Sequence, residues 1–270
     1  MPDEVRGQYD RNENKMWTFG IWCGLDFRTL PPTFFSPGMQ ANEGCASMCD
    51  GNGNLLFYTD GYNTFNRNHL MMPSGFGMIS FFTSSTSQGA VIVPVPGSTT
   101  QYYIFSLEWT AGNTAAPPVG RLCYSLVDMT MDGGLGDVAI AGVYMCANLG
   151  EKMIAVRGNA CNIWLLTHSK DSTLFRAYEI TPAGVNLTPV VSNVGTFTGA
   201  SSYSAGVMKI SHDRSKLVVQ CLRSVPGGAR GTELYDFNPA TGVVSNCRVL
   251  ENGRGCYGAE FSPDNSKLYS

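Results

Sequence analysis

A duplicated hairpin turn is the feature of this sequence that most constrains its fold. The segment Ser211-His-Asp-Arg-Ser-Lys-Leu217 recurs 51 residues later as Ser262-Pro-Asp-Asn-Ser-Lys-Leu268. Each copy follows one apolar stretch and leads into another, so each predicts two antiparallel strands joined by a tight turn. Recurrence at this spacing indicates a fold made of repeated supersecondary units.

Three further segments fit the same strand, turn, strand unit, namely Glu43 to Leu56, Gln88 to Phe105 and Glu151 to Leu166. The second strands of the five units align with successive spacings of 47, 61, 54 and 51 residues. These values are close to the about 40 to 50 residues of a four-stranded propeller blade. We therefore predict an all-β chain, a β-propeller of four-stranded blades with about five blade starts. The first strands of these blades are expected near Glu43, Gln88, Glu151, Gly206 and Gly258.

The two ends of the chain are predicted to depart from the repeat. Residues 1–16 are expected to form a polar N-terminal segment, and residues 17–270 a propeller that is incomplete at the C-terminus, because a strand begins at Leu268. Trp17 to Phe27 is expected to be an outer strand that completes the last blade. Met1 to Lys15 is polar and charged, unlike the basic and then apolar segments of a signal peptide.

Composition narrows the function classes. Charged residues make up 14% of the chain, below the roughly 25% of average domains, while 31 glycines and 14 prolines favour turns. The net charge is -3 and the 18 Lys and Arg residues are scattered singly, which argues against a nucleic-acid partner. No apolar run approaches the roughly 20 residues of a membrane helix. The nine cysteines lack a CxxC pair, and we interpret most of them as small buried hydrophobes.

An ordered series of motifs runs through the chain from Trp17 onward. It comprises Trp17-Thr-Phe-Gly20, Gly24-Leu-Asp-Phe27, Asn42-Glu-Gly44, Gly53-Asn-Leu-Leu-Phe-Tyr-Thr-Asp-Gly61, Tyr102-Tyr-Ile-Phe105, Tyr124-Ser-Leu-Val-Asp-Met129, Asp132-Gly-Gly-Leu-Gly-Asp137, Glu151-Lys152, Leu234-Tyr-Asp-Phe237 and Tyr257-Gly-Ala-Glu-Phe-Ser-Pro-Asp264. The series resembles the N-terminal propeller of large secreted surface proteins of Bacteroidota, which carry PKD repeats and a C-terminal sorting domain for type IX secretion or gliding motility. The resemblance implies a seven-bladed, YVTN or lactonase-like, WD40-like propeller. It also implies a secreted or cell-surface location and a role in adhesion as one module of a longer chain.

Two short motifs imitate known ligand-binding loops. Gly134-Leu-Gly136-Asp-Val-Ala139 matches the GxGxxA pattern of dinucleotide-binding folds, but the residues that follow it predict a strand where that fold needs a helix. Asp50-Gly-Asn-Gly-Asn54 resembles the start of a calcium loop, but Leu55 stands where glycine is required and Gly61 where glutamate is required. Both motifs are predicted to be turns.

A candidate binding site follows from the register of the repeats. Glu43 and Glu151 each lie 12 residues before an aligned second strand, so both are expected where an inner strand begins at one mouth of the propeller channel. Gln88 takes this position in the second unit, whereas Ala205 and Cys256 take it in the fourth and fifth, with Tyr257 adjacent. The predicted ligand-binding residues are Glu43, Gln88, Glu151 and Tyr257. Glu43 and Glu151 are the only metal candidates, and no cofactor is expected beyond a divalent cation such as calcium.

A structural interpretation of these side chains remains open, in which they hydrogen-bond the backbone of the neighbouring blade. Lys152 and His168 are weaker candidates, each expected to be a solvated or packed loop residue.

The function predicted first is a non-catalytic surface propeller that binds glycan, polymer or protein. The alternative is a lactonase-like or other hydrolytic propeller that uses the carboxylates with a divalent cation, and a propeller that only spaces other domains is a third possibility.

Overall fold

The computed structural model of the chain describes residues 11–79, 85–108, 120–196, 205–222, 231–252 and 255–270. These residues contain two 3-10 turns, η3 (Asn12–Asn14) and η4 (Asp132–Gly134), but no α-helix, so the chain is all-β as predicted. Among them, no helix is long and apolar enough to cross a membrane.

The described strands form six antiparallel sheets. The first sheet consists of β1 (Met16–Phe19), β2 (Cys23–Asp26) and β3 (Thr33–Phe35). The second consists of β4 (Ala46–Cys49), β5 (Leu55–Thr59) and β6 (Thr64–Asn66). The third consists of β7 (Ala90–Pro94), β8 (Gln101–Leu107), β9 (Leu122–Asp128) and β10 (Asp137–Cys146). The fourth sheet consists of β11 (Leu149–Arg157), β12 (Ile163–Ser169), β13 (Leu174–Thr181), β14 (Gly184–Val185) and β15 (Val190–Asn193). The fifth consists of β16 (Met208–Ile210), β17 (Lys216–Cys221), β18 (Gly231–Asn238) and β19 (Val243–Asn252). The sixth consists of β20 (Glu260–Phe261) and β21 (Leu268–Tyr269).

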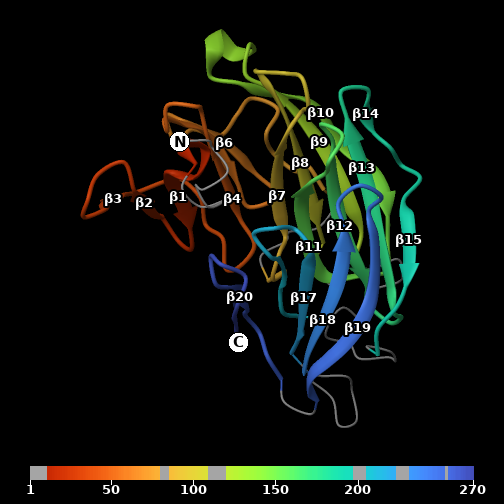
Figure 1. Cartoon of the computed structure of the whole chain (residues 1–270). Coiled ribbons are helices and arrows are strands. Elements are labelled where there is room, and N and C mark those ends of the chain that lie inside the picture. The colour runs from red at the N-terminus through yellow and green to blue at the C-terminus, as the bar shows by residue number, and fades with distance from the viewer. Residues whose placement is uncertain (1–10, 80–84, 109–119, 197–204, 223–230, 253–254) are drawn as a thin grey trace.

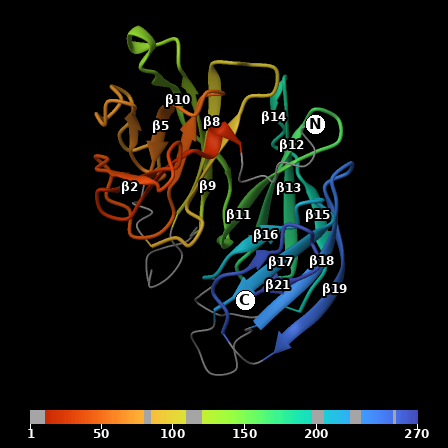
Figure 2. The same ribbon diagram turned by 60° about the vertical axis from the view of Figure 1, so that its left-hand side comes forward.

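The sheets stand side by side around a common centre (Figures 1 and 2). The strands at their inner edges follow one another around that centre, since β4 contacts β7, β7 contacts β11, β11 contacts β16 and β16 contacts β20. The third and fifth sheets have four strands paired in chain order, with β7 and β16 innermost. In the fourth sheet β14 and β15 share the outer position, because both pair with β13. The chain is therefore a β-propeller, in which two of the six described sheets have the predicted four strands.

The duplicated turn adopts the same structure in both copies. In the fifth sheet the Asp213 carboxylate accepts hydrogen bonds from the hydroxyl of Ser211 at 2.6 Å and from the amide of Ser215 at 3.0 Å. In the sixth sheet Asp264 accepts the corresponding bonds from Ser262 at 2.6 Å and Ser266 at 3.1 Å. The repeat read from the sequence is thus a repeat of specific hydrogen bonds.

Among the described residues the hydrophobic core forms four clusters, and each cluster lies between two successive sheets. In the cluster between the fourth and fifth sheets, Trp164, Phe175 and Leu166 of the fourth sheet pack against Tyr235 and Leu217 of the fifth. Strands with two buried faces contribute residues to two clusters, as in β12, where Leu166 and Leu165 point to opposite sides. Burial between neighbouring sheets therefore fixes the radial arrangement.

The N-terminal strands differ from the prediction. Trp17 to Phe27 is not a single outer strand, because β1 and β2 form a hairpin within a sheet of their own, and β1 contacts the inner strand β4. Gly20 favours the tight reversal, since glycine adopts its φ of +61° without the steric cost that a side chain brings. The first sheet begins at Met16, one residue before the predicted boundary of the propeller.

The two ligand-like motifs are turns as predicted, whereas the cysteines differ from the prediction. The calcium-like motif is a turn in which the carboxylate of Asp50 accepts from the amides of Asn52 and Asn54, and the GxGxxA motif leads into strand β10. The cysteines are less buried than predicted: three are buried, five are half-buried and Cys161 is exposed. None of the nine cysteines, all within the described ranges, forms a disulfide.

Candidate functional site

The candidate site lies where the inner strands begin. Glu43 precedes β4 by three residues, Gln88 precedes β7 by two, Glu151 is the third residue of β11 and Tyr257 precedes β20 by three. Strand β11 thus begins before its predicted start, and the other inner strands begin two or three residues after theirs. The four predicted residues therefore come from four different sheets or the segments leading into them.

Hydrogen bonds link three of these residues through a serine. The Tyr257 hydroxyl lies 3.1 Å from Oε1 of Glu43 and 3.1 Å from Oγ of Ser87. The Ser87 hydroxyl lies 3.2 Å from Oε2 of Glu151, and the amide of Gly206 donates to Ser87 Oγ at 3.1 Å. Glu43, Tyr257, Ser87 and Glu151 form a continuous chain of polar groups, which we call the mouth network.

The mouth network runs from solvent to the interior. Glu43 is exposed, Tyr257 is 40% exposed, Ser87 is half-buried and Glu151 is only 1% exposed. Partial burial raises the pKa of the Tyr257 hydroxyl, so this group stays protonated near neutral pH. The solvent-facing part of the network therefore presents one carboxylate and one phenolic hydroxyl.

The mouth network has more acceptor positions than hydroxyl protons. An ionised carboxylate only accepts, and the hydroxyls of Ser87 and Tyr257 carry one proton each. Tyr257 can donate to Glu43 or to Ser87, but not to both at once. The next nearest hydroxyl, that of Ser85, lies 3.5 Å from Oε2 of Glu43. The arrangement can therefore accept further hydrogen bonds from the hydroxyl groups of a ligand.

Glu151 holds a neighbouring segment in place. Its carboxylate accepts from both the amide and the hydroxyl of Ser87, each at 3.2 Å, and its backbone carbonyl accepts from the amide of Gln88 at 3.1 Å. Gly44 packs closely against the same segment, because a Cβ on Gly44 would lie 2.1 Å from the amide nitrogen of Gly89. Glu151 thus orients Ser87 from the buried side, which agrees with the interpretation that these side chains hydrogen-bond a neighbouring segment.

Gln88 also contacts backbone. Its side-chain Nε2 donates to the carbonyl of Met208 at 3.1 Å, and its Oε1 accepts from the amide of Met208 at 2.8 Å. This pair of bonds joins the segment before the third sheet to the first strand of the fifth sheet. Gln88 therefore serves as a tie between sheets, and its amide faces Met208 instead of the mouth network.

Lys152 and His168 lie inside strands β11 and β12, not in loops as predicted. Lys152 is 2% exposed and donates to the carbonyl of Ala205 at 3.3 Å, and burial lowers its pKa. His168 is 4% exposed, its Nδ1 lies 2.7 Å from the carbonyl of Ser169, and burial lowers its pKa to about 3. Both are packed residues, and His168 is neutral at physiological pH.

Ala205 and Cys256 stand at the positions of the fourth and fifth repeats that align with Glu43 and Glu151. Ala205 contributes its carbonyl to the contact with Lys152, and Cys256 is half-buried.

Metal binding has little support from this geometry. Within the ranges described, no group of three or more His, Cys, Asp or Glu side chains is placed to hold a metal ion. Glu43 and Glu151 reach each other through two intervening hydroxyls, while calcium takes about six to eight oxygen ligands. The mouth network is better suited to hydrogen bonding than to ion coordination.

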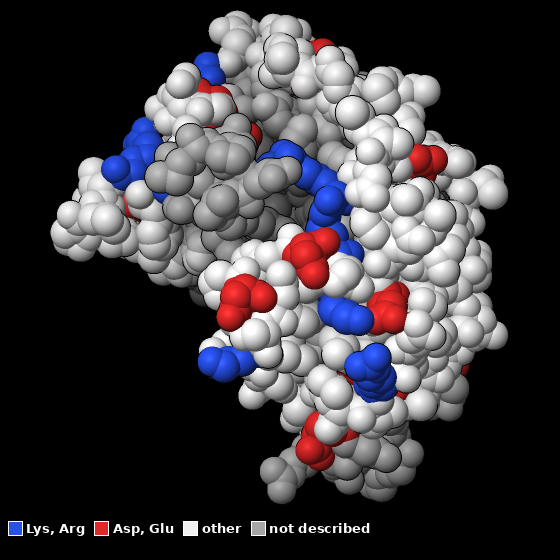
Figure 3. Space-filling model, viewed as in Figure 1, with Lys and Arg blue, Asp and Glu red and all other residues white. Residues whose placement is uncertain are grey.

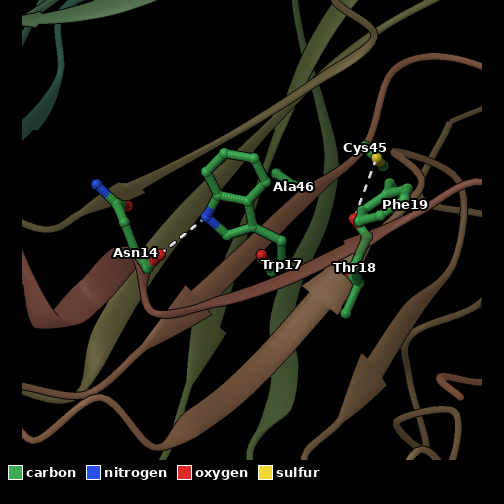
Figure 4. A pocket seen from close by; sticks show the side chains of 7 residues that line it. Asn14, Trp17, Thr18, Phe19, Cys45 and Ala46 are labelled. Atoms are coloured by element: carbon green, nitrogen blue, oxygen red, sulfur yellow. Dashed lines mark hydrogen bonds between the residues drawn. The ribbon is translucent and has the colours of Figure 1, made fainter. Parts of the chain in front are cut away.

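A pocket of about 490 Å³ lies close in sequence to Glu43 (Figure 4). It is lined by Asn14, Trp17, Thr18, Phe19, Cys45, Ala46 and Ser47. The indole of Trp17 is 46% exposed and donates to the carbonyl of Asn14 at 2.9 Å, while Cys45 donates to the carbonyl of Thr18 at 3.3 Å. The pocket therefore combines an exposed aromatic ring with polar backbone groups.

Sequence reasoning missed Ser87 and this pocket. Ser87 is next to the predicted Gln88, but the alignment of the repeats gave no reason to prefer a serine one position earlier. The sequence predicts an outer strand for Trp17 and Phe19, away from the centre. Their true position follows from the pairing of β1 with β2 and from its contact with β4.

No protein-family model matches the sequence, and no curated protein is significantly similar to it. The structure is similar to that of a Bacteroides fragilis protein provisionally assigned as a 6-phosphogluconolactonase, with a TM-score of 0.52 and 8% identity over 95% of this chain and 73% of that chain. More distant matches include a dihydro-heme d1 dehydrogenase (TM-score 0.41, 10% identity, 96% of this chain and 59% of that chain) and a GH43 β-1,3-galactosidase (0.40, 8%, 93% and 82%). At 8% identity the similarity to the Bacteroides fragilis protein concerns the fold alone, and it agrees with the radial arrangement of the sheets.

Proposed function

We propose that this chain is a non-catalytic propeller module that binds a hydroxyl-rich polymer, a glycan in the first instance, at the mouth network. The observation that carries the proposal is the chain of hydrogen bonds through Glu43, Tyr257, Ser87 and Glu151. Its solvent-facing end has unfilled acceptor capacity, which sugar hydroxyls can satisfy as donors.

The aromatic pocket supports the same ligand class. The exposed face of Trp17 can pack against the apolar face of a sugar ring, as aromatic side chains do in polar binding sites. The pocket residue Cys45 lies two positions after Glu43 on the chain. One polymeric ligand could thus contact both features.

The biological setting is part of the proposal. We propose that the module acts at the cell surface or outside the cell, within a longer adhesin-like protein. Support comes from the series of motifs that resembles surface propellers of Bacteroidota.

Glycan binding is tested by screening the protein on a polysaccharide array and titrating the best ligand by calorimetry. Tyr257→Phe and Glu43→Gln each remove part of the mouth network, and each is expected to weaken binding about tenfold, since a hydrogen bond involving a charged group contributes roughly 1.5–3 kcal/mol. Tyr144→Phe is the matched control, because Tyr144 is 54% exposed on the outer strand β10.

Equal affinities for all three variants would contradict the proposed site. Hydrolysis of a lactone, or calcium-dependent activity that is lost in Glu43→Gln, would support the hydrolytic alternative instead.

A further inference from the structure

The pocket beside Trp17 is formed by contact between two inner strands. Its residues belong to β1, to β4 with the residue before it, and to η3, and both β1 and η3 contact β4. The volume of about 490 Å³ falls within the range of about 300–1,000 Å³ that small-molecule sites occupy. We call this cavity the Trp17 pocket.

Side-chain hydrogen bonds join the two strands along the Trp17 pocket. The hydroxyl of Ser47 donates to the carbonyl of Met16 at 2.8 Å, and the thiol of Cys45 donates to the carbonyl of Thr18 at 3.3 Å. A hydroxyl has one proton and two lone pairs, so the oxygen of Ser47 can still accept a hydrogen bond from a ligand. The pocket therefore offers an acceptor in a fixed position.

Two aromatic rings line the same pocket. Trp17 and Phe19 are alternate residues of β1, so their side chains leave the strand on the same side, about 7 Å apart (Figure 4). They are 46% and 38% exposed. The indole of Trp17 donates to the carbonyl of Asn14 and lies 4.9 Å from the ring of Phe27, which holds it in one orientation. A ligand therefore meets an aromatic surface that is already in place.

The described side chains that line the Trp17 pocket are uncharged near neutral pH. Burial raises the pKa of the Cys45 thiol to about 11, so this group stays protonated, and the other lining residues are uncharged by type. The exposed carboxylate of Glu43 lies two positions before Cys45, at most about 7 Å away along an extended chain. A neutral ligand suits this combination better than an anionic one, which Glu43 would repel.

We propose that the Trp17 pocket is a second subsite, which holds one pyranose ring of a neutral, β-linked glycan chain whose neighbouring rings contact the mouth network. A pyranose with equatorial hydroxyls has apolar C–H faces, which pack against the indole, and a polar edge, which donates to acceptors such as Ser47. Equatorial linkages keep such a chain extended, so it can pass from one subsite to the other. The inference rests on the proposed function and narrows its ligand to a neutral chain that reaches both subsites.

The test is calorimetric titration with the disaccharides and hexasaccharides of β-1,4-linked glucose, xylose and N-acetylglucosamine. The best hexasaccharide is expected to bind the wild type at least about tenfold more tightly than its disaccharide, because only the longer chain fills both subsites. Trp17→Ala should remove this gain, since it deletes the stacking surface. Trp22→Ala is the matched control, because Trp22 is 52% exposed on the turn between β1 and β2 and does not line the pocket.

A second variant and a spectroscopic signal guard against a general loss of stability. Ala46→Leu fills part of the pocket but retains the contact of Trp17 with Phe27, and it should also reduce the gain from chain length. The chain has four tryptophans. The hexasaccharide should change the tryptophan fluorescence of the wild type and of Trp22→Phe, whereas Trp17→Phe should lose this change.

An acidic probe tests the predicted neutrality of the ligand. Figure 3 shows Lys and Arg side chains gathered along the hollow in the middle of one face, so general attraction to positive charge is the competing explanation for glycan binding. The β-1,4-linked glucuronate hexasaccharide should therefore bind more weakly than the neutral one. Equal or tighter binding of the glucuronate chain would overturn the neutral ligand class.

The variants also separate this inference from the proposed function. If Glu43→Gln weakens all ligands while Trp17→Ala and Ala46→Leu leave the gain from chain length intact, the second subsite is wrong and the mouth network stands. If Trp17→Ala weakens binding and Glu43→Gln does not, the pocket binds glycan without the mouth network, and the two-subsite arrangement is overturned. Absence of binding to all the neutral probes would overturn both proposals.

Discussion

At the residue scale, several polar side chains of this protein are buried within the inner part of the sheets. Glu151, Lys152 and His168 are each at most 4% exposed. Glu151 and Lys152 contact neighbouring segments, and His168 contacts the carbonyl of Ser169 in its own strand. Buried polar groups are costly unless they are hydrogen-bonded, so these residues constrain the local structure strongly. Because burial lowers the pKa of Lys152 and of His168, these two residues also make stability sensitive to pH.

The buried imidazole of His168 leads to a prediction about acid stability. Its pKa is lowered from 6.5 to about 3, chiefly by burial, so the unfolded chain binds a proton between these values and the folded protein does not. The stability that depends on neutral His168 is present above pH 6.5 and is lost as the pH falls toward 3. The melting temperature of the wild type should therefore fall more steeply from pH 6.5 to pH 4 than that of His168→Gln. Parallel melting curves over this range would show that another group controls the acid response.

At the element scale, the duplicated turn is the best-defined unit. An aspartate accepts from a serine two residues before it and another two residues after it, and the residue that follows the aspartate, Arg214 or Asn265, has a positive φ. The amide of His212 donates to Oδ1 of Asn265 at 2.7 Å, so the two copies also contact each other. The turn thus both reverses the chain and joins neighbouring sheets.

Removing the acceptor in one copy should destabilise its hairpin. Asp213→Ala deletes the bonds from Ser211 and Ser215, and we expect a loss of roughly 1 to 2 kcal/mol in the free energy of unfolding. Asp213→Asn keeps one acceptor oxygen and should cost less. Urea unfolding of the three proteins measures the difference, and equal midpoints for Asp213→Ala and the wild type would mean that the backbone alone maintains the turn.

At the scale of the whole molecule, the sheets are joined by burial between neighbours and by polar ties near the centre. Each core cluster connects only two successive sheets. The Gln88 side chain is different, because it links the segment before the third sheet to Met208 of the fifth. Such a tie couples sheets that share no core cluster.

Loss of this tie should be visible by hydrogen exchange. Gln88→Ala leaves the amide of Met208, a fully buried residue, without its 2.8 Å acceptor, and we expect that amide to exchange at least about tenfold faster. Gln101→Ala is the control, since Gln101 donates to Asp128 within the third sheet. Unchanged protection of Met208 in Gln88→Ala would mean that the core clusters alone hold the centre.

The sequence by itself determined the all-β class, the duplicated turn and the start of the inner strands to within a few residues. These features depend on local patterns, namely turn residues and alternating apolar runs, which act over a few positions of the chain. The alignment also identified Glu43 and Tyr257, which the structure brings within 3.1 Å of each other.

Only the tertiary structure decided which groups meet across the centre. Ser87 bridges Tyr257 and Glu151, Gln88 turns to the backbone of Met208, and Arg157 comes to lie beside Arg214. The arrangement of the first sheet could not be predicted from residues Trp17 to Phe27 alone, because its position depends on the contact between β1 and β4. These contacts join residues up to about two hundred positions apart, and they depend on how the sheets pack around the axis, which no local pattern of residues encodes.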